Sequence, residues 1–302
     1  LFHRGISAWI TRDSLLQPID TTFCQNGYLA DMHDFIRTPD GHKIMIAYYM
    51  QPVPMNEWVN GGDPNALIEV AIIQELSTDG QVIFEWNALD HMSPLDLENV
   101  LLTSPEIIFN HANSIDIDSD GHFILSSRNL NEVTKIHRQT GEIIWRWGAG
   151  QTNEFDFIDS YPFTFQHSVR PIGNNRYLLF DNGNFSSTYT NSPNYSRAVE
   201  FELDTANMTA AVVWEYVHPD SLFGPAMGSA QRLPNGNTLI NWGTQNSSDH
   251  GAIITEISPD GQVALELVFS QAENVYSASK HIAHWETTIP GCMDVAACNY
   301  NS

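Results

Sequence analysis

The chain is poor in cysteine, in positive charge and in long apolar runs. Its 302 residues include 3 Cys and 13 Lys or Arg against 36 Asp or Glu, which gives a formal net charge of −23. Such an acidic surface repels polyanions, so we expect neither nucleic acid nor an acidic membrane as a partner. No apolar run is long enough to span a bilayer. With 42% hydrophobic residues and 8 Trp, the composition is still that of a folded globular protein.

The cysteines are unevenly placed. Cys292 and Cys298 lie in a short polar stretch near one end, and Cys24 stands alone. Two close cysteines form a disulfide or ligate a metal, but no histidine or second cysteine pair lies near these two. We therefore expect a small disulfide, no metal, and an oxidising compartment, secreted or periplasmic.

One pattern recurs along the chain. A strand-like run, a tight Asp-Gly or Asn-Gly turn, a second apolar run and a segment ending in tryptophan follow one another several times. The clearest copies are HDFIRTPDGHKIMIAYY (33–49), HANSIDIDSDGHFILSSRN (111–129), HSVRPIGNNRYLLFDNGN (167–184) and SAQRLPNGNTLINWG (229–243). Repeats of this length, each unable to bury its own face, predict an all-β fold, a β-propeller.

The repeats also predict how the chain is divided. We expect one propeller domain over 1–290, followed by a cysteine-containing segment or linker over 291–302. Residues 1–30 would supply an incomplete first blade, and 275–287 one more inner strand. The propeller then has five blades if nothing is missing, or six if an N-terminal blade is absent from this sequence.

Aligning the turns brings polar residues into register. One column holds Asp40, Asp120, Asn174 and Asn235, and seven residues earlier stand His33, Asn113, His167 and Gly228. His111 precedes Asn113 by two residues, so strand alternation places it on the same side. Inner strands of a propeller surround a channel, so these groups should converge there. They could form a site, or they could be satisfied polar groups in a wet channel.

The string DIDSDG (116–121) matches the start of a calcium-binding loop. The position that should supply a bidentate glutamate is Ser127, and the same column elsewhere holds TPDG, STDG and SPDG, which are turns. We therefore interpret it as a hairpin turn.

Together the repeats resemble the bacterial arylsulfotransferase family, enzymes that move sulfate between aryl esters and phenols without a nucleotide donor. The resemblance covers about 31–286 and is carried by HANSIDIDSDGHFILSSRN, FQHSVRPIGNNRYLLFDNGN, SRAVEFELD and VVWEY. It implies a six-bladed propeller with the active site in its channel and no cofactor. Its small-molecule partners would be an aryl sulfate donor and a phenolic acceptor.

The resemblance also implies residue roles. The histidine that becomes transiently sulfated would be His167, in FQHSVRP. Residues resembling those that hold the sulfuryl group or activate the acceptor are His33, His111, Asn113 and Arg128. The fourth repeat offers Ser229 as a further substrate-binding candidate.

The residue types suit this chemistry independently. A neutral imidazole can act as the nucleophile of a two-step transfer, and the forked donors of Arg128 suit an oxyanion. Alternative roles stay open, because Arg128 could form a surface ion pair and His33 could be a structural channel histidine.

Two other functions are considered. A secreted, non-catalytic propeller could bind carbohydrate or protein through its loops, although it would have no reason to gather His167, His111, Asn113 and Arg128 on one wall. A quinone-dependent dehydrogenase propeller is less favoured, since no set of cofactor or calcium ligands is evident. The tail from Gly291 to Asn301 resembles cysteine-containing segments of secreted Bacteroidetes-type proteins, which suggests a longer exported parent.

Overall fold

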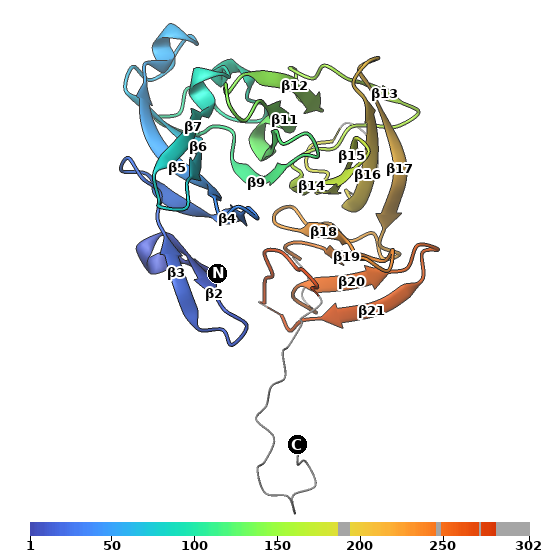
Figure 1. The fold of residues 1–302 in the computed structure, drawn as a ribbon. Helices are drawn as coiled ribbons and strands as arrows, with labels where there is room; N and C mark the ends of the chain where they lie inside the picture. Colours follow the sequence, from blue (N-terminus) through green and yellow to red (C-terminus); the bar gives the residue numbers. More distant parts are fainter. Residues whose placement is uncertain (187–193, 246–248, 272, 282–302) are drawn as a thin grey trace, which may run out of the picture.

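The computed structural model describes residues 1–186, 194–245, 249–271 and 273–281. Five sheets surround one centre (Figure 1), which confirms the all-β propeller. Helical structure in these ranges is limited to short 3-10 turns: η1 (Arg4–Ile6), η2 (Met55–Glu57), η3 (Ala88–Asp90), η4 (Pro94–Asp96) and η5 (Arg128–Leu130). No helix of the described chain is both long and apolar enough to cross a membrane.

Four sheets share an antiparallel four-strand order that begins at the centre and runs outwards. The first contains β4 (Leu29–Arg37), β5 (Lys43–Val53), β6 (Ala66–Leu76) and β7 (Val82–Asn87), with β8 (Glu106–Ile108) parallel to β6. The second contains β9 (Ala112–Ile117), β10 (Phe123–Ser127), β11 (Glu132–Ile136) and β12 (Ile143–Gly148). The third contains β14 (His167–Gly173), β15 (Arg176–Asp181), β16 (Arg197–Asp204) and β17 (Thr209–Val217), with β13 (Asp156–Ile158) parallel to β17. The fourth contains β18 (Ser229–Arg232), β19 (Thr238–Asn241), β20 (Ile253–Ile257) and β21 (Val263–Val268).

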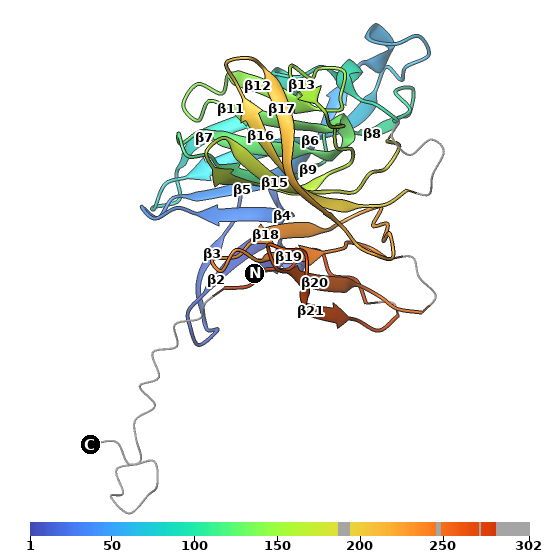
Figure 2. The ribbon, with the colours of Figure 1, turned by 90° about the vertical axis from the view of Figure 1, so that its right-hand side faces the viewer.

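The fifth sheet has three strands and lies beside β4 (Figures 1 and 2). It contains β1 (Phe2–His3), β2 (Ala8–Arg12) and β3 (Pro18–Thr22). This is the incomplete first blade that the sequence predicts. The predicted cysteine-containing segment, with Cys292 and Cys298, lies outside the described residues.

The inner strand predicted at 275–287 is not formed within 275–281, and 282–287 lies outside the described residues. The segment instead lies along β18 through side chains. Ser229 Oγ accepts a hydrogen bond from Ala278 N at 3.0 Å, and Gln231 Oε1 accepts one from Lys280 N at 2.7 Å. Because side chains rather than backbone groups take up these amides, no strand ladder develops.

The aligned turns adopt the conformations that their residues favour. Gly41, Gly121 and Gly236 lie in the left-handed region, with φ of 89°, 85° and 87°. Asn174 and Asn175 do the same at 55° and 56°, which suits a tight hairpin. The turns therefore hold the inner hairpins in the register that we assumed when aligning the repeats of this chain.

The calcium-like string forms such a hairpin turn. Asp118 Oδ2 is bound by Lys135 Nζ at 2.6 Å and by the hydroxyl of Tyr177 at 2.6 Å. Its carboxylate therefore links strands of neighbouring blades.

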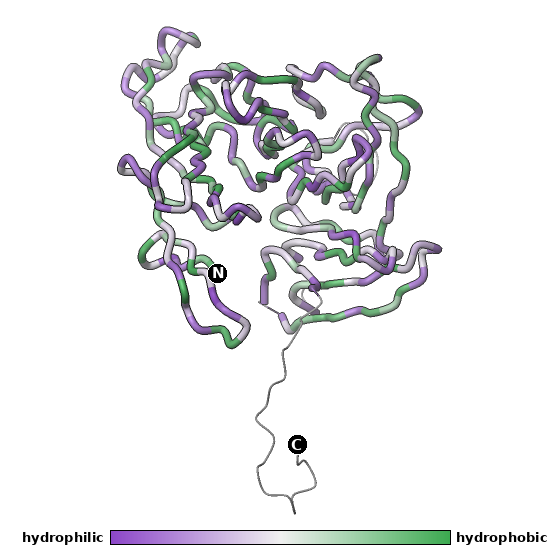
Figure 3. The backbone as a smooth tube through the Cα atoms, viewed as in Figure 1, coloured by the Kyte–Doolittle hydropathy of each residue, from purple (hydrophilic) through white to green (hydrophobic). Residues whose placement is uncertain are grey.

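Several tryptophans lie on the outer strands of their blades. They are Trp86 on β7, Trp145 and Trp147 on β12, and Trp214 on β17. Trp86 is buried and donates from Nε1 to the carbonyl of Gly141 in the next blade at 3.0 Å. Figure 3 shows hydrophobic stretches along the strands, and burying these apolar faces against neighbouring sheets stabilises the ring.

Candidate functional site

The inner strands β4, β9, β14 and β18 are consecutive neighbours around the centre (Figure 1). Side chains join them across the blades. Asp34 Oδ2 accepts a hydrogen bond from Ile115 N at 3.1 Å, and Ser114 Oγ accepts one from Val169 N at 3.0 Å. The strands thus bring residues that are far apart in sequence into one layer at the channel.

His33 and His111 meet in this layer, with ring centroids 5.1 Å apart. His111 does not follow the predicted strand alternation, because β9 begins only at Ala112 and His111 has a left-handed φ of 44°. This conformation is uncommon in residues other than glycine and concentrates at functional sites. A turn before the strand, rather than the strand itself, therefore aims His111 at His33.

His167 is buried at the start of β14, where the pairing with β15 is irregular between His167 and Arg170. Its Nδ1 lies 2.7 Å from Oδ1 of Asn182 and 3.1 Å from the carbonyl oxygen of Phe165. A carbonyl can only accept, so Nδ1 carries the hydrogen. Nε2 is then the nitrogen with a free electron pair.

The amide of Asn182 is oriented by its own partners. Its Nδ2 donates to the carbonyls of Gly224 at 2.6 Å and Met227 at 2.9 Å, which leaves Oδ1 for His167. Asn182 therefore holds the His167 ring in one tautomer. Asn182 could have been found from the sequence, because it lies as many residues after the Asn174–Asn175 turn as His167 lies before it. Our sequence analysis did not include it.

Burial keeps both inner histidines neutral. Desolvation lowers the pKa of His167 to about 3, with smaller contributions from the positive charge of Arg128 and from His111 and His33. Desolvation also lowers the pKa of His111 to about 3, again with help from His33 and Arg128. A neutral imidazole is the form that can attack an electrophile.

Arg128 begins η5 and is tied to this layer, since its backbone N–H donates to the carbonyl of His111 at 3.1 Å. The guanidinium lies 4.3 Å from the centre of the Phe165 ring, and burial lowers its pKa. Within the described residues Arg128 forms no ion pair, and its buried Nε has no hydrogen-bond partner. The alternative of a surface ion pair is therefore wrong for the described chain. Arg128, Phe165 and Phe185 line a cavity of about 360 Å³.

His33 is held by a carboxylate. Its Nδ1 forms a short contact with Asp31 Oδ1, and its backbone N–H donates to the same oxygen at 2.9 Å. Asp31 and Tyr48 line a second cavity of about 280 Å³, and the Tyr48 ring stacks near His111 at 6.4 Å. Our sequence reading missed Asp31 and Tyr48. Asp31 lies two residues before His33 on β4, so strand alternation could have predicted that the two side chains share a face. Tyr48 belongs to the neighbouring strand β5, and the sequence near His33 does not indicate it.

The two predicted substrate-binding residues differ in their contacts. Asn113 is buried and donates from Nδ2 to the carbonyl of Gln166 at 2.6 Å, while its Oδ1 has no partner in the described residues. Ser229 Oγ is engaged with the backbone of Ala278 and, among the described residues, forms no hydrogen bond with the three histidines. Asn113 thus belongs to the histidine layer, and Ser229 supports the neighbouring segment.

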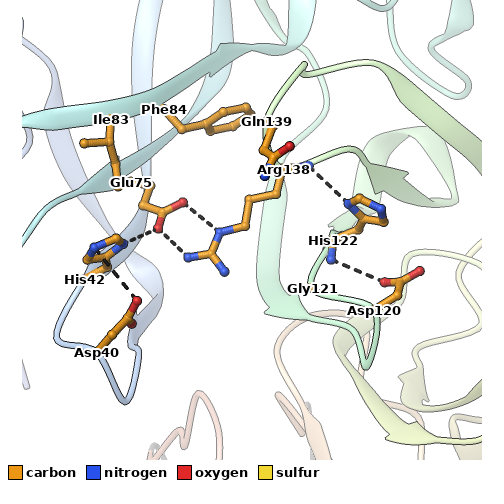
Figure 4. Close-up of a pocket in the computed structure, with 10 residues that line it drawn as sticks. All are labelled: Asp40, His42, Glu75, Ile83, Phe84, Asp120, Gly121, His122, Arg138 and Gln139. Atoms are coloured by element: carbon orange, nitrogen blue, oxygen red, sulfur yellow. Dashed lines mark hydrogen bonds and ion pairs between the residues drawn. The ribbon is translucent and has the colours of Figure 1, made fainter.

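A larger cavity, of about 560 Å³, lies on the turn side between the first two four-stranded blades (Figure 4). Its charged groups are paired with one another. Glu75 accepts a hydrogen bond from His42 Nδ1 at 2.8 Å and is bound by both arms of Arg138. None of the three histidines of the channel layer lines it, and the paired groups link two blades.

Comparison with known proteins gives one family. The family model described as Arylsulfotransferase (ASST) matches residues 8–277. No curated protein matches the chain.

Solved structures share the fold at low identity. A protein of unknown function from Bacteroides caccae is 14% identical with a TM-score of 0.52, over 87% of this chain and 75% of that one. A virginiamycin B lyase from Staphylococcus aureus is 10% identical with a TM-score of 0.39, over 78% and 54%. A streptogramin B lyase is 12% identical with a TM-score of 0.42, over 90% and 78%. At 14% identity the likeness to the Bacteroides caccae protein concerns the fold alone.

Proposed function

Because the chain belongs to the arylsulfotransferase (ASST) family, we propose that it moves a sulfuryl group from an aryl sulfate to a phenol through sulfated His167. The observation that carries the proposal is the hydrogen on His167 Nδ1, held by Asn182 and the Phe165 carbonyl. It leaves Nε2 as a neutral nucleophile within the electrostatic influence of the Arg128 guanidinium, which donates to Asn129 Oδ1 at 3.2 Å and forms no ion pair among the described residues. Nucleophile and oxyanion partner are the two groups that sulfuryl transfer needs.

In the first step Nε2 attacks sulfur, the bond from sulfur to the aryl oxygen breaks, and the aryl oxygen leaves with the electron pair. Negative charge on the sulfuryl oxygens is stabilised by Arg128, whose forked N–H groups suit an oxyanion. The cavity beside Arg128 is lined by Phe165 and Phe185 and also by Glu106, so it presents a guanidinium, aromatic surface and a carboxylate; His33, His111 and His167 do not line it.

In the second step the phenol oxygen attacks the same sulfur, the N–S bond breaks, and its electron pair returns to Nε2. The phenol must lose its proton, and His33, oriented by Asp31, is the base we assign. The second step is chemically the reverse of the first with a different aryl group. The group that takes the proton from the acceptor therefore also supplies one to a departing aryl oxide.

The proposal is tested by mixing the protein with 4-nitrophenyl sulfate without an acceptor. We expect a burst of one nitrophenolate per protein and an intact mass increased by one SO₃, located on His167. The His167→Asn variant should show neither. His91→Asn, which changes an exposed histidine stacked on Trp86, is the matched control and should behave as wild type. A normal burst from the His167 variant would assign the nucleophile elsewhere and overturn the proposal.

A further inference from the structure

Tyr276 closes one side of the histidine layer. Its ring lies edge-on to His33, at 5.3 Å between centroids, and to His167, at 6.5 Å. Its hydroxyl donates to the backbone carbonyl of Asn113 at 3.3 Å. Tyr276 therefore touches both the nucleophile and the base of the proposed reaction.

The backbone around Tyr276 is held in place, although it belongs to no strand. Its carbonyl accepts hydrogen bonds from Gly228 N at 3.1 Å and from Asn241 Nδ2 at 3.0 Å. Asn241 is fully buried on β19 and also binds the carbonyl of Val275 at 2.8 Å. The backbone that carries the ring is thus held by Gly228 and by Asn241 of β19.

A polar cavity of about 550 Å³ lies next to this layer. Its lining includes Asp34, Ser168 and Ser277. These residues directly follow His33, His167 and Tyr276 in the sequence. His33, His167 and Tyr276 do not line it themselves. Carboxylate, hydroxyl and guanidinium groups make this space one that holds water. Tyr276 packs edge-on against His167, and the residue after each of them, Ser277 and Ser168, lines this wet cavity.

We infer that Tyr276 is a specificity-determining residue that keeps water from sulfated His167, so that a phenol receives the sulfuryl group. This inference rests on the proposed function. In the competing reaction the oxygen of water attacks sulfur, the N–S bond breaks with its electron pair returning to Nε2, and water loses a proton to His33. Hydrogensulfate is then released. Water and phenol undergo the same displacement, so the protein can favour the phenol only by controlling access.

The test compares Tyr276→Ala with Tyr276→Phe, using 4-nitrophenyl sulfate as donor and phenol as acceptor. Inorganic sulfate and phenyl sulfate are quantified in the same reaction. We expect the alanine variant to raise the ratio of hydrolysis to transfer about tenfold, which corresponds to about 1.4 kcal/mol between the two barriers. The phenylalanine variant keeps the ring and should retain the wild-type ratio. The inference would be overturned if the alanine variant lost inorganic sulfate and phenyl sulfate equally. It would also be overturned if the alanine and phenylalanine variants had the same ratio of hydrolysis to transfer.

A second measurement does not depend on activity. Diethyl pyrocarbonate modifies neutral imidazole, and its reaction at His167 can be followed by peptide mass spectrometry. We expect faster modification in Tyr276→Ala than in wild type or Tyr276→Phe, and equal rates would contradict shielding by the ring. If the wild-type protein gives no burst, the proposed function fails while this labelling still decides whether Tyr276 shields His167. Circular dichroism establishes that each variant is folded, and Tyr276→Val replaces the alanine variant if that one is not.

Discussion

His167 Nδ1 donates its hydrogen to Oδ1 of Asn182 across 2.7 Å, and this contact decides which nitrogen of the buried imidazole is nucleophilic. Asn182 lies beyond the end of β15, while His167 begins β14. Antiparallel pairing of the two strands makes them neighbours. The proposed nucleophile is therefore oriented within its own hairpin, whereas Arg128, which is proposed to assist it, comes from the preceding blade.

The first prediction concerns Asn182 as a positioning residue. Asn182→Leu removes the acceptor at similar size, so we expect the burst rate with 4-nitrophenyl sulfate to fall about 10- to 100-fold, the effect of one buried hydrogen bond. Nitrogen-15 NMR of the His167 ring should show loss of the single Nδ1–H tautomer, a readout that a merely structural role would not change. An unchanged tautomer with a slow burst would contradict the assignment.

The second prediction concerns Arg128. Arg128→Lys keeps a positive charge but loses the fork, so we expect burst and transfer rates to fall about 100-fold. Arg176→Lys is the control, because Arg176 is partly exposed and pairs with Glu202 at 2.7 Å away from the channel layer. Equal losses in both variants would show that general electrostatics, rather than a specific clamp, is needed.

The third prediction separates His33 from His167. With 4-nitrophenyl sulfate, whose departing phenolate needs no proton, we expect His33→Asn to give a detectable burst and a sulfated protein. Transfer from that species to phenol should fall about 100-fold or more, since no base remains for the acceptor. Stopped-flow addition of phenol to the sulfated variant measures this step. Transfer at the wild-type rate would show that His33 is not the base and has a structural role.

The fourth prediction concerns pH and stability. Unfolded histidine takes up a proton below about pH 6.5, whereas folded His167 and His111 resist protonation down to about 3. Between these values the unfolded state binds more protons, so the free energy of unfolding falls as pH falls, by up to about 1.4 kcal/mol per pH unit for each histidine. Urea unfolding at pH 6.5 and 5 should show a shallower dependence for His167→Asn than for wild type. Identical slopes would contradict the lowered pKa.

The fifth prediction concerns the ion-pair network shown in Figure 4. Glu75→Gln leaves Arg138 and His42 without their carboxylate, and we expect a loss of about 2 kcal/mol in the free energy of unfolding. This is less than for a fully buried pair, since 25% of the Arg138 side chain is exposed. Glu202→Gln, which breaks a more exposed pair, is the control and should have little effect. The burst should be normal in both, and a lost burst in Glu75→Gln would link this cavity to the reaction.

Much of the site could be predicted from turn positions. Because a tight turn sets the register of its hairpin, counting back seven residues brought His33, Asn113 and His167 to one layer. His111 was also predicted there, but for the wrong reason, since its left-handed φ and not strand alternation directs it. Ser229 does not share this register, since the column holds Gly228, and its hydroxyl is engaged with the backbone of Ala278.

Tyr276 shows what counting could not supply. The sequence predicts an inner strand over 275–287, and the described part, 275–281, forms none. Its ring reaches the layer because Gly228 and Asn241 fix its backbone, and such contacts between distant residues follow no local period.

The sequence by itself determined the repeated hairpins, the propeller they form and the histidines that converge in its channel. These features depend on local rules, namely alternation along strands and the left-handed conformations that glycine and asparagine tolerate in turns. Only the tertiary structure decided that His167 and His111 are neutral, that Nδ1 of His167 carries the hydrogen, and that Arg128 has no carboxylate partner within the described residues. Protonation and pairing depend on burial and on charges supplied by other blades, and both are set when the blades pack together.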